Sequence, residues 1–163
     1  MYHYRDATLA DFQLIASFPQ SKEELFYMYP KGTFPLTAEQ LADAAYRRLS
    51  LTVAMDSDDI VGYSNLYNVA AGEDCWIGNV IIKPTSRGTG AASFLIQTMI
   101  NRAAEEHQAK NVHLVCHNAN SRALLFYHKL GFVPYEISPI EDSNQGKIAG
   151  IRMRIAVEGQ VTL

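Results

Sequence analysis

Two short blocks of the chain hold residues whose types and spacing could do chemistry. The first reads "RGTGAA" over residues 87–92 and lies between an apolar strand-like run and an apolar helical pattern. At the start of a helix the backbone N–H groups lack intrahelical partners, and the helix dipole makes this end partly positive. Because side chains are small or absent at most of these positions, the N–H groups could bind phosphate. The guanidinium of Arg87 also has a shape that suits phosphate oxygens.

The glycine loop alone does not identify a ligand. It is not a Walker loop, because no Gly-Lys-Ser/Thr follows it, and it lacks the third glycine of the dinucleotide fingerprint. A tight strand-to-helix turn with close packing accounts for Gly88 and Gly90 equally well. A site for the phosphates of a nucleotide is a further interpretation.

The second block reads "NSRALLFYHKLGF" over residues 120–132 and predicts a short helix that contains a tyrosine. That tyrosine could be a half-buried side chain with its hydroxyl on a carbonyl, or a proton donor. Together the two blocks contain R-x-x-G-x-A and N-x-x-A-x-x-x-Y-x-x-x-G-F, and they resemble the GNAT superfamily of acyl-CoA-dependent N-acyltransferases. The matching positions are Arg87, Gly90, Ala92, Asn120, Ala123, Tyr127, Gly131 and Phe132.

The resemblance implies a site for acetyl-CoA as co-substrate. It implies that N–H groups of the glycine loop hold the pyrophosphate, that the strand before the loop pairs with the pantetheine amides, and that Asn120 reaches the pantetheine arm. A bulge, for which Gly78 and Asn79 are suited, would splay that strand from the next one. The implied cofactor-binding residues are Val80, Ile81, Ile82, Arg87, Gly88, Thr89, Gly90, Ala91, Ala92, Asn120 and Tyr127.

The implied reaction is N-acetylation of a primary amine by direct attack on the thioester carbonyl. An oxyanion develops during the attack, and the N–H of Val80 or Ile82 could stabilise it. The thiolate then leaves, and Tyr127, whose ordinary pKa is about 10, is protonated at neutral pH and can donate its proton to the sulfur. Tyr127 is therefore the predicted catalytic residue.

The chain departs from the family pattern at the expected general base. Many members carry a glutamate early in the fourth strand, at a position that aligns here with Trp76, and an indole cannot act as a base. Glu73 and Asp74 precede it in a turn and could act through water, although turn carboxylates are also ordinary solvated residues. The base is unassigned, and Trp76 motivates an alternative function: a catalytically inactive acyl-CoA-binding regulatory module.

An aromatic cluster after the first helix is the candidate for lining the acceptor pocket. Alternatively, these aromatic side chains only hold their own loop in place. The acceptor could be a small-molecule amine or a peptide N-terminus, and the sequence does not choose between them. The candidate substrate-binding residues are Phe26, Tyr27, Tyr29 and Phe34.

Three further residues invite a chemical role but are interpreted as structural. His113 and His117 lie four apart on one face of a predicted strand, yet no third ligand is evident, so no metal is expected. Cys116 is expected to be a small core side chain, because nothing nearby guarantees the thiolate that an acyl-cysteine intermediate needs.

The bulk properties exclude several classes of protein. The 163 residues are 48% hydrophobic and 19% charged, with a formal net charge of −3, which argues against a nucleic-acid binder. No run reaches the roughly 18 apolar residues of a membrane span, and the charged N-terminus is no secretory signal. Two cysteines are too few for a disulfide framework. We expect a cytoplasmic protein with one domain over residues 1–163, and a homodimer is compatible with the fold.

The periodicity predicts a mixed α/β (α+β) fold with a central sheet of about six to seven strands and about four flanking helices. The resemblance implies that this fold is of the GNAT type, with strands four and five splayed apart. Four helices are expected: from the Thr8 cap to about Phe18, after the Thr37 cap, from Ala92 to at least Ala103, and over 121–130. In the helix after Thr37, the residues Leu41, Ala45 and Leu49 are expected to share one face. Residues 19–35 are expected to be irregular. Strands are expected at 2–7, 51–55, 60–69, 75–82, 112–116, 132–137 and 147–155, with a turn at 141–146.

Overall fold

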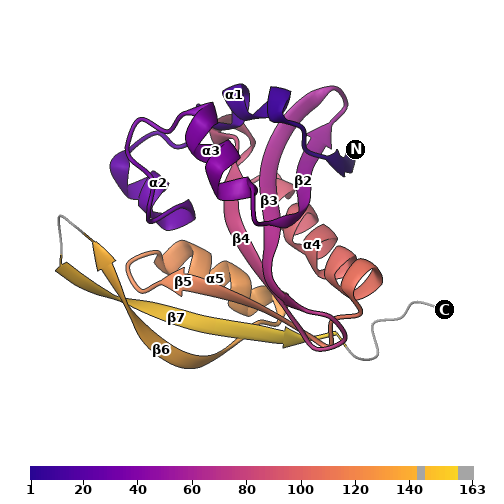
Figure 1. The fold of residues 1–163 in the computed structure, drawn as a ribbon, viewed down its shortest axis with the longest axis vertical. Helices are drawn as coiled ribbons and strands as arrows, with labels where there is room; N and C mark the ends of the chain where they lie inside the picture. The colour runs from indigo at the N-terminus through magenta and orange to yellow at the C-terminus, as the bar shows by residue number, and fades with distance from the viewer. Residues whose placement is uncertain (143–145, 158–163) are drawn as a thin grey trace.

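The computed structural model describes residues 1–142 and 146–157, and these form a seven-stranded mixed sheet with helices on both faces (Figure 1). The strands follow the order β1-β2-β3-β4-β5-β7-β6. The strands are β1 (Tyr2–Asp6), β2 (Leu49–Asp56), β3 (Asp59–Ala70), β4 (Asp74–Ile82), β5 (Asn111–His117), β6 (Val133–Asp142) and β7 (Gly146–Ala156). The α-helices are α1 (Phe12–Ile15), α2 (Lys22–Met28), α3 (Ala38–Ala45), α4 (Ala91–His107) and α5 (Ser121–Leu130), with 3-10 helices at Leu9–Asp11 and Pro84–Ser86.

The one parallel pair among the described strands, β4 with β5, is short. It joins Asp74 to Asn111 and ends at the pair Trp76 and His113, so the C-terminal part of each strand has no partner on this side. The two strands then diverge, and Figure 1 shows β1–β4 in one part of the sheet and β5–β7 in the other. The predicted splay between strands four and five is confirmed.

A β-bulge bends β4 just after the parallel pairing ends. Gly78 pairs with Asn65 and Ile81 pairs with Tyr63. Between these two pairs β4 advances by three residues while β3 advances by two, so β4 carries one extra residue. Asn79 sits in this extra step with φ +50°, a left-handed backbone value that asparagine tolerates better than most residues. The bulge lies where the sequence predicts it.

Each face of the sheet carries its own buried core. Helices α4 and α5 cover one face. Of the α4 residues that the periodicity predicts to face the core, Ile96, Met99, Ile100 and Ala103 are at most 2% exposed, and Ala92 is half-buried. Helices α1, α2 and α3 cover the N-terminal half of the other face, where Leu41 and Ala45 of α3 are buried.

Three sequence expectations about the first fifty residues are wrong in detail. The first helix is a 3-10 turn followed by α1, which ends at Ile15 rather than Phe18. Leu49 belongs to β2 and is exposed rather than part of the buried face of α3. The segment 19–35 contains α2, which raises the number of α-helices from about four to five. The expected turn at 141–146 includes residues 143–145, which lie outside the described ranges.

Helix α2 has a start signal in the sequence that the surrounding Pro and Gly residues obscure. The Ser21 hydroxyl accepts a hydrogen bond of 3.1 Å from the Glu24 N–H, and the Glu24 carboxylate accepts one of 3.0 Å from the Gln20 N–H. Ser-x-x-Glu is the sequence form of a capping box. The flanking Pro19, Pro30 and Gly32 bound the helix instead of excluding it.

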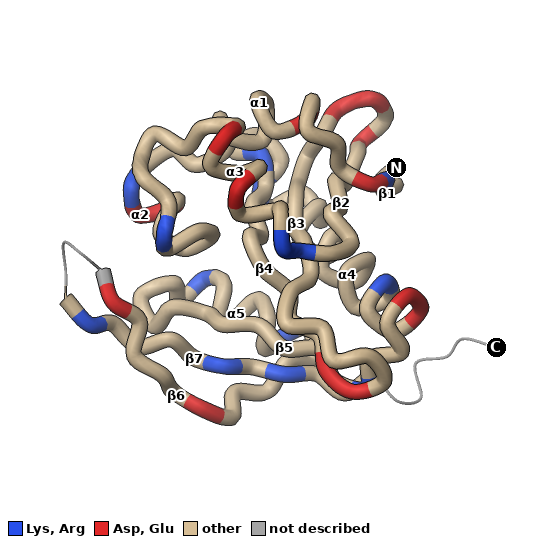
Figure 2. Tube along the Cα trace, in the orientation of Figure 1, with Lys and Arg blue, Asp and Glu red and all other residues tan. Residues whose placement is uncertain are grey.

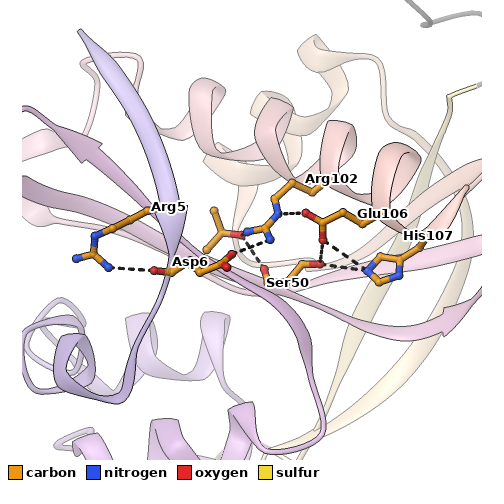
Figure 3. Close-up of polar contacts among 7 residues, drawn as sticks. Arg5, Asp6, Ser50, Arg102, Glu106 and His107 are labelled. Carbon is orange, nitrogen blue, oxygen red and sulfur yellow. Dashed lines mark hydrogen bonds and ion pairs between the residues drawn. The ribbon is translucent and has the colours of Figure 1, made fainter.

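Arg102 fixes α4 against β1 and β2 (Figure 3). Its buried guanidinium donates to Thr52 Oγ1 at 2.9 Å, pairs with Asp6 at 2.7 Å and donates to Glu106 at 2.6 Å. The other carboxylate oxygen of Glu106 accepts a hydrogen bond from Ser50 Oγ at 2.6 Å. Because hydrogen bonds to charged groups stabilise more than neutral ones, these contacts hold α4, and the loop before it, at one position on the sheet.

Within the described ranges, no helix has the length and apolar character needed to cross a membrane.

Candidate functional site

A cleft of about 1250 Å³ opens where β4 and β5 diverge. Its walls are β4 at residues 77–82 and β5 at residues 114–117, with the end of α2, the loop before α4, and α5 around them. Because these stretches of β4 and β5 do not pair with each other, the cleft passes between two strands of one sheet. A ligand in it can therefore reach backbone groups as well as side chains.

The loop before α4 presents backbone donors at one end of the cleft. No described residue accepts a hydrogen bond from the N–H groups of residues 88–93. Gly88 has φ +76°, and Gly90, the N-cap of α4, has φ +94°, both in the left-handed region that favours glycine. Helix α4 has 17 residues, so its dipole adds to the positive character of this end. The loop has the geometry of an anion cradle.

Not every residue of the predicted cradle faces the cleft. Gly88, Gly90 and Ala92 line it, whereas Ala91 is fully buried in the core. Thr89 also does not line the cleft. The Tyr2 hydroxyl shares its one proton between the Thr89 carbonyl oxygen, at 2.9 Å, and the Thr89 hydroxyl oxygen, at 2.8 Å, and so ties the loop to β1.

Arg87 lines the cleft, but its guanidinium already has protein partners. It forms an ion pair with Glu24 of α2 and donates to the carbonyl oxygens of Ile82 at 3.3 Å and Phe18 at 3.4 Å. Its backbone N–H donates to Pro84. This differs from the expectation that the guanidinium is available for phosphate, because that expectation did not include α2 and its carboxylate.

Tyr127 and Asn120 both reach the cleft from α5. The Asn120 side chain accepts a hydrogen bond of 3.4 Å from the Ala123 N–H, so it caps the helix and lines the cleft at once. Tyr127 is 9% exposed, and its hydroxyl makes no hydrogen bond to a described residue. Burial, with a smaller effect of nearby Cys116, raises the pKa of Tyr127 well above its ordinary value, so its proton is present at any physiological pH.

Cys116 lies in the wall of the cleft but is not prepared to act as a nucleophile. Burial raises the pKa of its thiol to about 11, so the thiolate is scarce at neutral pH. Its sulfur lies 3.7 Å from the carbonyl oxygens of His117 and Asn120. This agrees with the structural interpretation of Cys116.

His117 is the residue of the cleft that the sequence interpretation undervalued. It is 4% exposed, its Nδ1 is buried, and neither ring nitrogen has a hydrogen-bond partner among the described residues. Its ring lies 4.8 Å from that of Phe26 and 5.6 Å from that of Tyr27, so α2 holds it in place. Burial lowers the pKa of His117, which leaves it neutral with a free lone pair at pH 7. Its signal in the sequence is a polar residue at the end of a buried strand.

The bulge at Asn79 is held by a chain of amide hydrogen bonds. Asn79 Nδ2 donates to the Met28 carbonyl at 2.8 Å, and Asn79 Oδ1 accepts from Asn65 Nδ2 at 2.9 Å. The Asn65 amide also donates to the Tyr63 hydroxyl at 3.0 Å, and its oxygen accepts from Arg48 Nη1 at 3.0 Å. The carbonyl at Met28 therefore fixes the orientation of both amides and links α2, β4 and β3 at the cleft.

The four candidate acceptor residues do not all meet in one place. Tyr27 and Tyr29 line the cleft. Phe26 packs on His117 behind it. Phe34 lies elsewhere, in the wall of a second hollow of about 510 Å³ near α3.

The carboxylates considered as bases lie outside the cleft. Glu73 is exposed and 3.5 Å from Lys110. Asp74 accepts from His113 Nε2 at 2.8 Å, and Trp76 stacks on the His113 ring at 4.7 Å. In the described ranges no group of three or more His, Cys, Asp or Glu side chains could hold a metal ion.

A family match agrees with this geometry. The sequence profile of the Acetyltransferase (GNAT) family matches residues 12–132, which include the cradle, the bulge and α5. No curated protein sequence matches the chain at a significant level.

Three solved structures with the same fold are named as acetyltransferases. Spermidine N-acetyltransferase from Vibrio cholerae, in complex with CoA and spermine, is 18% identical with a TM-score of 0.78, and the match covers 95% of each chain. The ribosomal-protein-S18-alanine N-acetyltransferase from Escherichia coli is 17% identical with a TM-score of 0.74, over 96% of this chain and 94% of that one. A GCN5-related N-acetyltransferase from Kribbella flavida is 24% identical with a TM-score of 0.71, over 96% and 98%. At these identities the likeness establishes the fold.

The amide chain around the bulge gives a test with a matched control. Replacing Asn79 by leucine leaves the Met28 carbonyl and one Asn65 donor unpaired in a buried place, and each such group costs about 1–3 kcal/mol. Asn68 of β3 has a similar left-handed φ of +46° but is exposed. Asn79→Leu should lower the free energy of unfolding in urea by about 2 kcal/mol more than Asn68→Leu. Equal losses of unfolding free energy in the two variants would mean that asparagine stabilises these positions through its left-handed backbone conformation, and not through the amide chain.

Proposed function

This chain belongs to the acetyltransferase (GNAT) family, and we propose that it transfers the acetyl group of acetyl-CoA directly to a primary amine in a ternary complex. The observation that carries the proposal is the cleft between β4 and β5, which has unpaired backbone donors at one end and a protonated tyrosine in its wall. The Vibrio cholerae neighbour of the same fold holds CoA.

The residues of the cleft fit coenzyme A. Its diphosphate suits the N–H groups of residues 88–93, which have no described acceptor. Its pantetheine arm has amides that can pair with the open side of β4 at residues 77–82. Asn120 reaches the same space with the part of its amide that does not cap α5. A nucleotide alone would satisfy the loop but leave the strand edge unpaired.

When bound, acetyl-CoA supplies a thioester whose carbonyl is open to attack by an amine. The chain supplies groups for the charges that the attack creates. An N–H of β4, at Val80 or Ile82, can donate to the carbonyl oxygen as it becomes negative. The Tyr127 hydroxyl is protonated and has no described acceptor, so it can donate its proton to the departing sulfur.

The amine must lose a proton, and we propose that His117 accepts it. This side chain is neutral, lines the cleft and has a free lone pair. Successive side chains of a strand point to opposite faces. Cys116 therefore lies with Tyr127 in the core on the side of α4 and α5, while His117 faces α2. The proposed proton acceptor and proton donor thus lie on opposite faces of β5, so separate groups can take the proton of the amine and supply one to the departing sulfur.

The proposal is tested by transfer to a panel of amines, with acetylated products detected by mass spectrometry. Tyr127→Phe should lower kcat by roughly 10²-fold, as for the loss of a general acid, with the affinity for coenzyme A retained. Tyr135→Phe is the matched control, because the Tyr135 hydroxyl bonds His113 outside the cleft.

One outcome would overturn the proposal, and another would change its mechanism. A protein that binds coenzyme A but acetylates no amine would be the inactive acyl-CoA-binding module that Trp76 suggests. Equal rates for Tyr127→Phe and the parent would remove the proton donor from the mechanism.

The cradle is tested by a charge placed at the third residue of α4. Ser93 is exposed and lines the cleft. A carboxylate at this position favours the helix through the dipole but repels a bound diphosphate. Ser93→Glu should therefore weaken coenzyme A binding by about 10-fold or more relative to Ser93→Gln, measured by calorimetry without loss of thermal stability. The same affinity in both variants would place the diphosphate elsewhere.

The role of His117 is tested by the pH dependence of kcat. Because burial lowers the pKa of His117 below its ordinary value of 6.5, activity should be retained at neutral pH and lost as the pH falls through this lower pKa. His117→Ala should lower kcat by about 10²-fold or more and remove this acid limb. His113→Gln, four residues earlier and outside the cleft, should keep it. An unchanged acid limb in His117→Ala would exclude His117 as the base.

A further inference from the structure

Arg48 is a partly buried cation in the cleft without a carboxylate partner among the described residues. It lies between α3 and β2, donates from Nη1 to Asn65 Oδ1 at 3.0 Å, and its guanidinium carbon lies 4.2 Å from the centre of the Tyr67 ring. It lines the same cleft as Tyr127 and His117. A guanidinium has five N–H donors, and the described residues accept a hydrogen bond from one of them here.

The charges that line the cleft are unbalanced. The one carboxylate in its described wall is Glu24, and Arg87 already pairs with it. Three cations then remain, at Lys31, Arg48 and Arg122. The basic segment between α3 and β2, blue in Figure 2, lies beside β3 and β4. The cleft therefore favours an anionic group on its ligand.

The structure holds the Arg48 side chain in one place. The Asn65 oxygen faces it because the other end of that amide is committed to Tyr63 and Asn79. Gly78 gives it room, because a Cβ built there would overlap Nη1 of Arg48. Burial lowers the pKa of Arg48, but a guanidinium stays charged at neutral pH. The Arg48 guanidinium is fixed in position, charged and has free N–H donors, so it can bind a planar anion such as a carboxylate.

We propose that the acceptor is a small amine that carries a carboxylate, as an amino acid does, and that Arg48 binds this carboxylate. The inference rests on the proposed acetyl transfer and names the class of its acceptor. A carboxylate accepts two parallel hydrogen bonds from a guanidinium, and this pairing is strong where water is partly excluded. A polyamine would instead bring its cations against Lys31 and Arg48. A peptide N-terminus has no carboxylate next to its amine unless a side chain supplies one.

The test compares pairs of acceptors that differ only in charge: each amino acid and its neutral amide, across a panel of side chains. For the amino acids that are acetylated, kcat/KM should exceed that of the amide by about 10- to 100-fold, the range of a hydrogen bond to a charged group. The amine of the amide is less basic than that of the acid, so more of it is unprotonated and ready to attack at neutral pH. This difference favours the amide, and a preference for the acid would have to exceed it. Arg48→Met should bring the ratio close to one, and Arg48→Lys should keep part of it.

A second variant moves Arg48 without removing its charge. Gly78→Ala forces the guanidinium away from its position over β4, so it should also reduce the ratio of acid to amide. Circular dichroism and the thermal unfolding temperature report that each variant is folded.

The outcomes separate this inference from the proposed acetyl transfer. If neutral amines are acetylated as well as amino acids, or if Arg48→Met lowers both rates equally, acetyl transfer stands and the carboxylate site is wrong. If no amine is acetylated, binding of the amino acids and their amides to the coenzyme A complex decides. Binding of the acids alone, lost in Arg48→Met, would support the site and reject the transfer. Absent or charge-independent binding would reject the site too.

Discussion

The end of the pairing between β4 and β5 after Trp76 is the constraint on which the rest of the site depends. A strand edge left open inside a protein has N–H and C=O groups that must find partners. Here the edge opens into a cleft, where a ligand can supply them. The bulge at Asn79 makes the opening possible, because it turns β4 away from β5 while β4 stays paired with β3.

The amide chain at the bulge joins the two halves of the cleft. It begins at the last residue of α2, passes through Asn79 and Asn65, and ends at the guanidinium of Arg48. Helix α2 contributes twice, since its Glu24 also holds Arg87 of the loop before α4. A single seven-residue helix thus positions both the proposed diphosphate cradle and the proposed acceptor site. Movement of α2 would alter both sites together.

Local signals in the sequence predict much of the fold. The limits of α5 follow from Asn120 and Gly131, and the buried face of α4 follows from its period. The bulge follows instead from the resemblance to the family, and Gly78 and Asn79 are suited to it. Contacts between distant segments leave no such signal. The ion pair of Arg87 requires α2, which is distant in sequence. The ring nitrogens of His117 lack partners among the described residues because no polar group of another segment approaches them, and residue spacing does not encode such an absence.

The same limit applies to the general base and the acceptor site. The family pattern places a base in β4, at the position of Trp76, and the nearest carboxylates lie in the turn before it. In the structure those positions contact His113 and Lys110 on the outer part of the sheet, away from the cleft. The neutral imidazole of His117 is instead on β5, across the cleft from the open edge of β4. Arg48 follows α3 and lies over β4 at Gly78. Both side chains line the cleft that the divergence of the two strands opens, and this is where the proposed reaction would take place.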